Sequence, residues 1–253
     1  MPNSYENDSG GRVAVITGSG KGIGKAAATE FAKAGYSVMI NDLEQEDELK
    51  RTVEEISKII GYGSSNKIAY VLGDVSREDV SVSLIDQTIR NFGRIDVLIN
   101  NAGIAEKWQQ KKQNEIPTTA TNSYYKQVSP YFTLEEYEIA DTNLRSSYLC
   151  IREAVKRIIE AKKEAEKVAK GAGKRSSSYS IINISTPYES IPKQEAESYT
   201  LSMSGVDPFT SSRTGVKTLT KTVALQLADM GIRVNAIVPG LIATNASKQR
   251  KWW

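Results

Sequence analysis

The chain has 253 residues, of which 40% are hydrophobic and 25% are charged, as in one globular domain rather than a disordered protein. Its 33 basic and 30 acidic residues give a net charge of only +3, which argues against a nucleic-acid or acidic-membrane partner. Because the chain contains no histidine and one cysteine, it excludes histidine-based triads, histidine metal sites and an internal disulfide.

The same inventory gives expectations for the compartment and for the thiol. Cys150 lies in the apolar-flanked stretch "SSYLCIREAV", which is typical of a small buried hydrophobe. No apolar run approaches the roughly 18–20 residues of a membrane span, and no export signal is recognised. We therefore expect a cytoplasmic protein without a membrane partner.

Short runs rich in Val, Ile and Leu alternate with amphipathic stretches of helical period along the chain. The runs predict strands that are buried on both faces, at 12–18, 36–42, 67–75, 96–103, 179–185 and 233–240. The stretches between them predict helices, at 25–35, 46–60, 78–92 and 215–231. This alternation predicts an α/β fold of three layers, with a doubly wound parallel sheet.

Two segments break the alternation. Residues 104–132 are polar, contain proline and have no clear period, which predicts a long surface insertion. Residues 152–175 carry dense charges of both signs, which indicates a solvated helix that ends near "GAGKR". We expect a second insertion at about 160–178.

The stretch "ITGSGKGIG" joins the first predicted strand to the first predicted helix. Its Gly18, Gly22 and Gly24 suit a tight turn in which the backbone approaches a pyrophosphate, and the helix start supplies N–H groups for the phosphates. Because this loop lies within a strand–loop–helix context, it predicts a dinucleotide site.

Two residues bear on the choice of dinucleotide. Asp42 ends the second predicted strand, where a carboxylate accepts hydrogen bonds from ribose hydroxyls and repels a 2′-phosphate. Lys21, inside the loop, favours the opposite choice, because its cation could meet a 2′-phosphate. We predict NAD as the preferred cofactor, with NADP as the alternative.

Four later stretches complete a resemblance: "GDV" (73–75), "NNAG" (100–103), "NIST" (183–186) and "VPGLIAT" (238–244). Together with the glycine loop, they resemble the short-chain dehydrogenase/reductase family over nearly the whole chain, with members of the glucose 1-dehydrogenase and 3-oxoacyl-carrier-protein reductase type most similar. The resemblance implies one NAD(P)-binding Rossmann domain over residues 1–253, with strand order 3-2-1-4-5-6 and a seventh strand in the family.

The resemblance also implies the residues of the cofactor site. Asp74 and Val75 should meet adenine, Asn101 to Gly103 the adenosine side, and Ile242 with Thr244 the carboxamide. The full set of expected cofactor residues is Gly18, Gly20, Lys21, Gly22, Ile23, Gly24, Asp42, Leu43, Asp74, Val75, Asn101, Ala102, Gly103, Ile184, Arg213, Pro239, Gly240, Ile242 and Thr244.

For catalysis the family uses an Asn, a Ser, a Tyr and a Lys. Asn143 matches the first position, and Thr186 falls at the serine position with an equivalent hydroxyl. The family's Y-x-x-S-K-A-G-V reads "FTSSRTGV" here, so that Phe209 replaces the tyrosine and Arg213 the lysine. Phenylalanine cannot exchange a proton, which should lower the rate about 10²–10⁴-fold. Arg213 keeps the charge and could bond ribose hydroxyls, in a different shape.

Another proton donor could stand in for residue 209. Tyr199 lies thirteen residues after Thr186, the family's spacing, but Met203 follows where a lysine should be. We therefore leave two functions open. One is an NAD(P)-dependent oxidoreductase for a carbonyl or alcohol on a sugar or oxoacyl-like substrate, with Asn143, Thr186 and Arg213 placing the oxygen and Tyr199 or water relaying the proton. The other is a catalytically impaired NAD(P)-binding protein that acts as a sensor or assembly partner.

The end of the chain and its assembly give two further expectations. The family runs some forty to fifty residues past "PG-x-x-x-T", whereas the printed chain stops at "NASKQRKWW". Either the substrate-covering region is shortened, or the printed sequence is incomplete. By analogy with the family, the helices that begin near Asn143 and Phe209 should form the contact of a homodimer or homotetramer.

Overall fold

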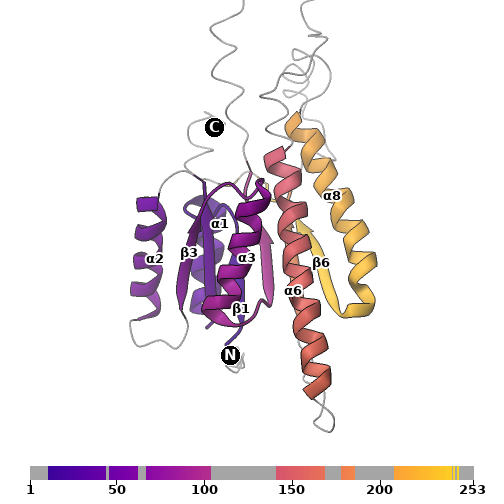
Figure 1. Ribbon diagram of the computed structural model, residues 1–253. Helices are drawn as coiled ribbons and strands as arrows, with labels where there is room; N and C mark the ends of the chain where they lie inside the picture. Colours follow the sequence, from indigo (N-terminus) through magenta and orange to yellow (C-terminus); the bar gives the residue numbers. More distant parts are fainter. Residues whose placement is uncertain are drawn as a thin grey trace, which may run out of the picture.

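The computed structural model describes residues 11–43, 46–61, 67–103, 141–168, 178–185, 208–240, 242 and 244. These residues form one sheet with helices on both faces (Figure 1). The strands are β1 (Val13–Ile16), β2 (Ser37–Asp42), β3 (Ile68–Leu72), β4 (Val97–Asn100), β5 (Tyr179–Ile184) and β6 (Ile232–Ile237). The helices are α1 (Gly22–Lys33), α2 (Glu46–Ile60), α3 (Glu78–Phe92), α6 (Ser146–Val168) and α8 (Pro208–Leu227), with a π-helical turn η2 (Asp141–Arg145) and a 3₁₀ turn η4 (Ala228–Met230).

The sheet has the predicted topology. Its six strands lie in the order β3-β2-β1-β4-β5-β6, and every neighbouring pair is parallel. This order confirms the doubly wound α/β fold, and it reverses direction between β1 and β4, where such sheets bind ligands outside the carboxyl ends of their strands. A seventh strand is not found among the residues that the structure describes.

Successive side chains of each strand enter two different cores, because side chains alternate between the faces of a sheet. On one face, Val15, Met39 and Leu98 pack with α3, α6 and α8. On the other face, Ile16, Ile40 and Ile99 pack with α1 and α2. Figure 1 shows the same division, with α3 and α6 in front of the sheet and α1 behind it. The strands are therefore apolar at nearly every position, as their sequences predicted.

The strands end earlier than their sequences suggested. The predictions ran on through "GDV" and "NNAG", whereas β3 ends at Leu72 and β4 at Asn100. After β4 the backbone N–H of Asn101 donates to the Thr17 hydroxyl at 3.0 Å instead of continuing the ladder. These strand ends therefore become loops at the carboxyl edge of the sheet.

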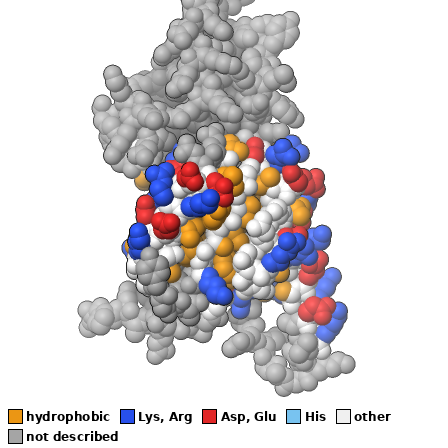
Figure 2. Space-filling view, turned by 60° about the vertical axis from the view of Figure 1, so that its left-hand side comes forward, with side chains coloured by type: hydrophobic (Ala, Val, Ile, Leu, Met, Phe, Trp, Pro, Cys, Tyr) orange, Lys and Arg blue, Asp and Glu red, His pale blue; other side chains and the backbone are white. Residues whose placement is uncertain are grey.

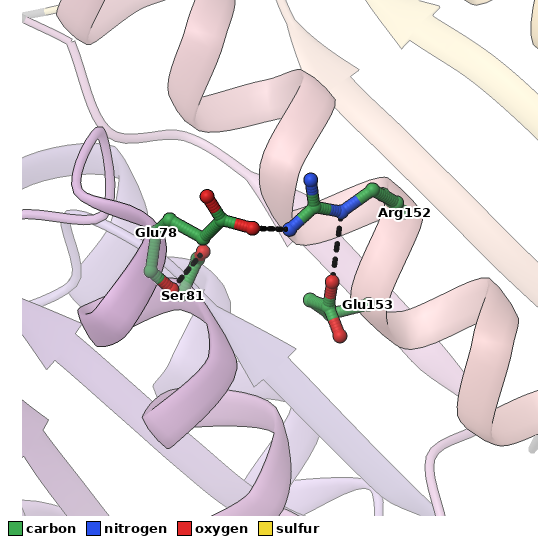
Figure 3. Close-up of polar contacts among 4 residues, drawn as sticks. All are labelled: Glu78, Ser81, Arg152 and Glu153. Atoms are coloured by element: carbon green, nitrogen blue, oxygen red, sulfur yellow. Dashed lines mark hydrogen bonds and ion pairs between the residues drawn. The ribbon is translucent and has the colours of Figure 1, made fainter.

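Residues 160–168, which fall in one predicted insertion, continue the helix α6. Two arginines of α6 fasten it to α3: Arg152 pairs with Glu78 at 2.6 Å, and Arg157 pairs with Asp86 at 2.5 Å. Figure 3 shows Arg152 between Glu78 and Glu153, which it contacts at 2.6 and 2.8 Å. These ion pairs connect α3 to α6, the helix that directly follows η2 and Asn143. The predicted insertion at 104–132 lies outside the described residues.

Charged side chains of both signs are mixed on the face shown in Figure 2, with apolar side chains between them. Elsewhere in the described part, Lys25 pairs with Glu55 at 2.7 Å and Lys50 with Glu46 at 3.2 Å.

In the described ranges, no helix combines the length and apolarity that a membrane crossing needs. Cys150 is fully buried in the core, as predicted.

Candidate functional site

The glycine loop follows β1 and packs against the turn that follows β4. Gly18 and Gly22 have φ of +60° and +59°, a region that favours glycine. A Cβ on Gly18 would lie 2.7 Å from the Cα of Ala102, and a Cβ on Gly24 would overlap the carbonyl oxygen of Gly18. Gly18 and Gly22 therefore allow the backbone conformation of the turn. Gly18 and Gly24 allow a close backbone contact that a larger residue would prevent.

Thr17 joins the same two loops by hydrogen bonds. Its hydroxyl accepts the backbone N–H groups of Asn101 and Ala102, each at 3.0 Å. The side-chain amide of Asn101 donates in return to the carbonyl oxygens of Thr17 at 3.0 Å and Gly18 at 2.7 Å. Sequence reasoning missed Thr17, although a hydroxyl between an apolar strand and a glycine loop was a signal. The Asn101 side chain thus holds the loop in place.

Asp42, at the end of β2, points toward the loop. Its Oδ2 accepts the N–H of Gly20 at 2.9 Å, and its Oδ1 accepts the N–H of Leu43 at 2.8 Å. A Cβ on Gly20 would lie 2.8 Å from Oδ2, so this glycine makes room for the acid. Each carboxylate oxygen can accept a further hydrogen bond. The predicted ribose contact therefore fits the position of this carboxylate.

The loop after β3 lies beside Asp42, because the N–H of Gly73 donates to the Asp42 carbonyl at 2.9 Å. The Asp74 carboxylate accepts the N–H of Ser76 at 2.8 Å, which forms an Asx turn just before α3. Val75 is 2% exposed and packs in the core of the α3 face, so its side chain serves packing. The expected adenine contacts of Asp74 and Val75 stay predictions.

The start of α1 suits the phosphates. Lys21, the exposed N-cap residue, has no acceptor in its side chain and so cannot cap the N–H groups of the first turn. The space beside Gly22 is bordered by Thr244, whose Cγ2 would be 3.7 Å from a Cβ there. Thr244 thus lies over the glycine loop. The side chain of Ile242, two residues earlier, is 47% exposed. Among the described residues, the glycines of this loop and the first turn of α1 fit the pyrophosphate of a dinucleotide.

The remaining expected cofactor residues lie around this edge of the sheet. Ile23 is in the first turn of α1, and Leu43 is exposed after β2. The side chain of Ile184 is buried at the end of β5, and Pro239 and Gly240 follow β6. The fold brings these residues to one edge, where their contacts to a cofactor stay predictions.

Asn143 lies in η2, a π-helical turn of the kind often found at functional sites. Its side chain is fully buried and donates to the hydroxyl of Ser212 on α8 at 3.2 Å. The predicted catalytic asparagine is thereby joined to the helix that carries the Phe209 and Arg213 positions.

Arg213 extends from α8 to the end of β5. Its guanidinium is buried, with the residue 6% exposed, and Nη1 donates to the carbonyl oxygen of Ile184 at 2.6 Å. A Cβ on Gly103 would overlap Nη2, so the arginine fits closely against the turn after β4. Burial lowers the pKa of Arg213 to about 10, which still leaves the group protonated at neutral pH. The cation is therefore retained at the lysine position.

Three of the predicted residues cannot be placed in full. The backbone of Phe209 lies in α8, one turn before Arg213, but its side chain is outside the described part. Thr186 and Tyr199 also lie outside the described residues. Ser185, next to Thr186, is buried after β5 and donates its hydroxyl to the Arg213 carbonyl at 3.4 Å. The catalytic set stays a prediction.

Sequence reasoning also missed a buried chain of polar side chains behind the site. Asn100 donates to Asn183 at 2.8 Å, Asn183 donates to Thr220 at 2.8 Å, and Thr220 donates to the Val216 carbonyl at 2.7 Å. The chain connects the ends of β4 and β5 with α8. A polar residue ending each of two apolar strands, "VLIN" and "YSIIN", was the available signal.

The sequence was compared with known proteins. A model of the short chain dehydrogenase family matches residues 12–253. The chain is 29% identical over 243 residues to glucose 1-dehydrogenase 2 of Bacillus subtilis, covering 95% of this chain and 76% of that protein. It is 31% identical over 245 residues to 3beta-hydroxysteroid dehydrogenase 1 of Eggerthella lenta, covering 96% of this chain and 76% of that protein.

A third relative has another substrate in its name. The chain is 28% identical over 232 residues to the 3-oxoacyl-(acyl-carrier-protein) reductase FabG of Staphylococcus epidermidis, covering 92% of this chain and 75% of that protein. The relatives thus have similar identities to the chain, while their names refer to a sugar, a steroid and an acyl group.

Proposed function

Because the chain belongs to the short-chain dehydrogenase family, whose members are NAD(P)-dependent oxidoreductases, we propose that it binds NAD(H) and interconverts an alcohol and a carbonyl compound. The observation that carries the cofactor part is the cradle formed by the glycine loop and Asp42. Bound NAD(H) would supply or accept the hydride. The residues of the chain hold the dinucleotide and place the substrate oxygen.

The preference for NAD is supported by the position of Asp42. Its carboxylate is held at the end of β2 by the N–H groups of Gly20 and Leu43, at 2.9 and 2.8 Å. A 2′-phosphate placed there would meet a fixed negative charge, whereas ribose hydroxyls would find acceptors. We expect titration with NADH and NADPH, followed by fluorescence, to give tighter binding of NADH, and Asp42→Ala to narrow the difference.

We propose an alcohol or carbonyl compound as the substrate, either a sugar or an oxoacyl-like compound. The names of the three relatives support the class, since each refers to a dehydrogenase or a reductase. Asn143, Thr186 and Arg213 would position and polarise the substrate oxygen, and Tyr199 or water would relay the proton. An absorbance assay with NADH and a panel of carbonyl compounds tests this; no turnover across the panel would contradict it.

A second function is favoured by the helix α8. Phe209 has no proton to exchange, and Arg213 is bonded to the Ile184 carbonyl at 2.6 Å. Under this alternative, the protein binds NAD(H) without turnover and acts as a sensor or assembly partner. The two functions differ in one comparison: the parent against the Phe209→Tyr, Arg213→Lys double variant. Turnover only in the double variant identifies an impaired enzyme, while turnover in the parent that Thr186→Ala abolishes identifies an active one.

We also propose that the protein forms a homo-oligomer through α6 and α8. Two large apolar side chains on these helices support this: Tyr148 is 51% exposed and Leu225 is 81% exposed. Sedimentation analysis should show a dimer or tetramer, and Leu225→Asp should shift it toward the monomer. A parent that sediments as a monomer at every concentration would contradict the proposal.

A further inference from the structure

Thr52 contacts the glycine loop from α2, on the side of the loop that faces the protein interior. The residue is fully buried, and its hydroxyl donates to the carbonyl oxygen of Gly20 at 2.9 Å. The bond connects residues that are 32 positions apart in the sequence. A threonine in the middle of a helix therefore holds a residue of the predicted cofactor loop.

Gly20 is held on both sides by this arrangement. Its N–H donates to Asp42 Oδ2 at 2.9 Å, while its carbonyl accepts from Thr52 at 2.9 Å. The two groups belong to the peptide planes before and after the Gly20 Cα. Because glycine has little conformational preference of its own, these two hydrogen bonds fix both planes. The Gly20 N–H in turn fixes one oxygen of the Asp42 carboxylate.

Thr88, a fully buried threonine in another helix, behaves differently. The hydroxyl of Thr88, also fully buried, donates at 2.7 Å to the Leu84 carbonyl one turn earlier in its own helix, α3. Thr52 instead reaches a separate segment. The helix α2 is further tied to α1 by the ion pair of Glu55 with Lys25 at 2.7 Å. Thr52 therefore lies on a helix whose position beside α1 and the glycine loop is stabilised by a second contact.

We propose that Thr52 is a positioning residue for recognition of the adenosine ribose: by fixing Gly20, it holds Asp42 in the orientation that favours NAD over NADP. The inference rests on the proposed NAD site and adds to it a residue that touches no cofactor. When the hydroxyl is removed, the buried Gly20 carbonyl loses its donor and the loop peptide is free to turn. The Asp42 carboxylate then keeps only the Leu43 N–H as a fixed partner, so its orientation is less restricted.

The experiment compares Thr52→Val, which keeps the shape, with Thr52→Ser, which keeps the hydroxyl. Thr88→Val is the matched control, since it removes an equally buried hydroxyl from another helix. Dissociation constants for NADH and NADPH are measured by fluorescence titration. We expect Thr52→Val to weaken NADH binding roughly threefold to tenfold and NADPH binding less, so that the ratio of the two constants shrinks. Thr52→Ser and Thr88→Val should retain the parental ratio.

Amide hydrogen exchange of Gly20 in the unliganded protein gives a second readout. We expect faster exchange in Thr52→Val than in Thr88→Val, because the Gly20 N–H is held less firmly. If Thr52→Val does not fold, Thr52→Ala takes its place in both measurements.

The outcomes separate this inference from the proposed function. A parent that prefers NADH together with an unchanged ratio in Thr52→Val overturns the role of Thr52 and leaves the NAD site standing. A parent that binds neither dinucleotide overturns both. A smaller ratio in Thr88→Val, equal to that in Thr52→Val, also overturns the inference, because the effect would then follow general destabilisation.

Discussion

The two halves of the sheet's carboxyl edge are built in different ways. Around β1 and β2, the cradle consists mostly of backbone held at close range, with Gly18, Gly20 and Gly24 where a Cβ would collide. Around β5 and α8, the arrangement depends on long or polar side chains, with Arg213 reaching the Ile184 carbonyl and Asn143 reaching Ser212. The first half tolerates almost no change of residue size, and the second can exchange one side chain for another while keeping the fold.

This difference bears on the predicted departures from the family at Phe209 and Arg213, both of which lie on α8. Arg213, at the predicted lysine position, carries a cation and donates to the Ile184 carbonyl, so the fold accommodates an arginine there. A side chain at Gly24 could not be accommodated in this way, because two of the three nearest atoms belong to the backbone of Gly18 and Ser19. The predictions below test this contrast, beginning with the largest expected effect.

Gly24→Ala should abolish dinucleotide binding, with an affinity loss of at least about 100-fold, because its Cβ would overlap the Gly18 carbonyl and displace the loop. Titration calorimetry with NADH measures the loss. The control is Gly93→Ala, at the left-handed C-cap of α3 with φ +78° and no atom within 4 Å of the added Cβ. It should lower the melting temperature and leave the affinity unchanged. Parental binding in Gly24→Ala would refute the close-contact account of the loop.

Gly103→Ala should destabilise the parent by about 2–3 kcal/mol, since the new Cβ would displace the buried guanidinium of Arg213. In an Arg213→Met background the same change should cost less, because only Asn143 Oδ1, 2.8 Å from the added Cβ, remains in close contact. A double-mutant cycle from urea unfolding measures this coupling. Equal costs in the two backgrounds would show that Arg213 does not occupy the space beside Gly103.

Thr220→Val should destabilise the fold by about 1–3 kcal/mol, because the fully buried Asn183 amide would lose its acceptor. Thr88→Val is the comparison, since that hydroxyl is bonded to the carbonyl of its own helix and its removal should cost less. Chemical unfolding of both variants measures the difference. If both variants lose the same stability, the polar chain from Asn100 to Thr220 contributes nothing beyond packing.

The effect of Cys150 depends on pH, because burial raises the pKa of its thiol from 9.0 to about 12. Between these values the unfolded chain ionises its thiol while the folded chain keeps it protonated. The stabilisation from this group is therefore complete below pH 9 and is lost as the pH rises toward 12, by up to about 1.4 kcal/mol per pH unit. Urea unfolding at pH 8 and pH 10 should show a steeper loss in the parent than in Cys150→Ala. Parallel losses would contradict a buried, protonated thiol.

The amino-acid sequence by itself determined the fold and the location of the glycine loop. Apolar runs such as "VAVI" and "VLIN" predicted strands buried on both faces, and glycines at fixed spacing predicted the loop after the first strand. These features depend on local residue type, since a buried parallel strand is apolar throughout and a tight loop needs glycine. Their signal is therefore present in a few neighbouring residues.

Only the tertiary structure decided which side chains hold the site together. Gly20 is glycine because Asp42 lies beside it, Thr17 holds the turn after β4, and Thr52 reaches the loop from α2. These contacts join residues far apart in the sequence, and a hydroxyl or an amide has the same letter wherever its partner lies. The sequence could name such residues, but their partners follow from the packing of helices against the sheet.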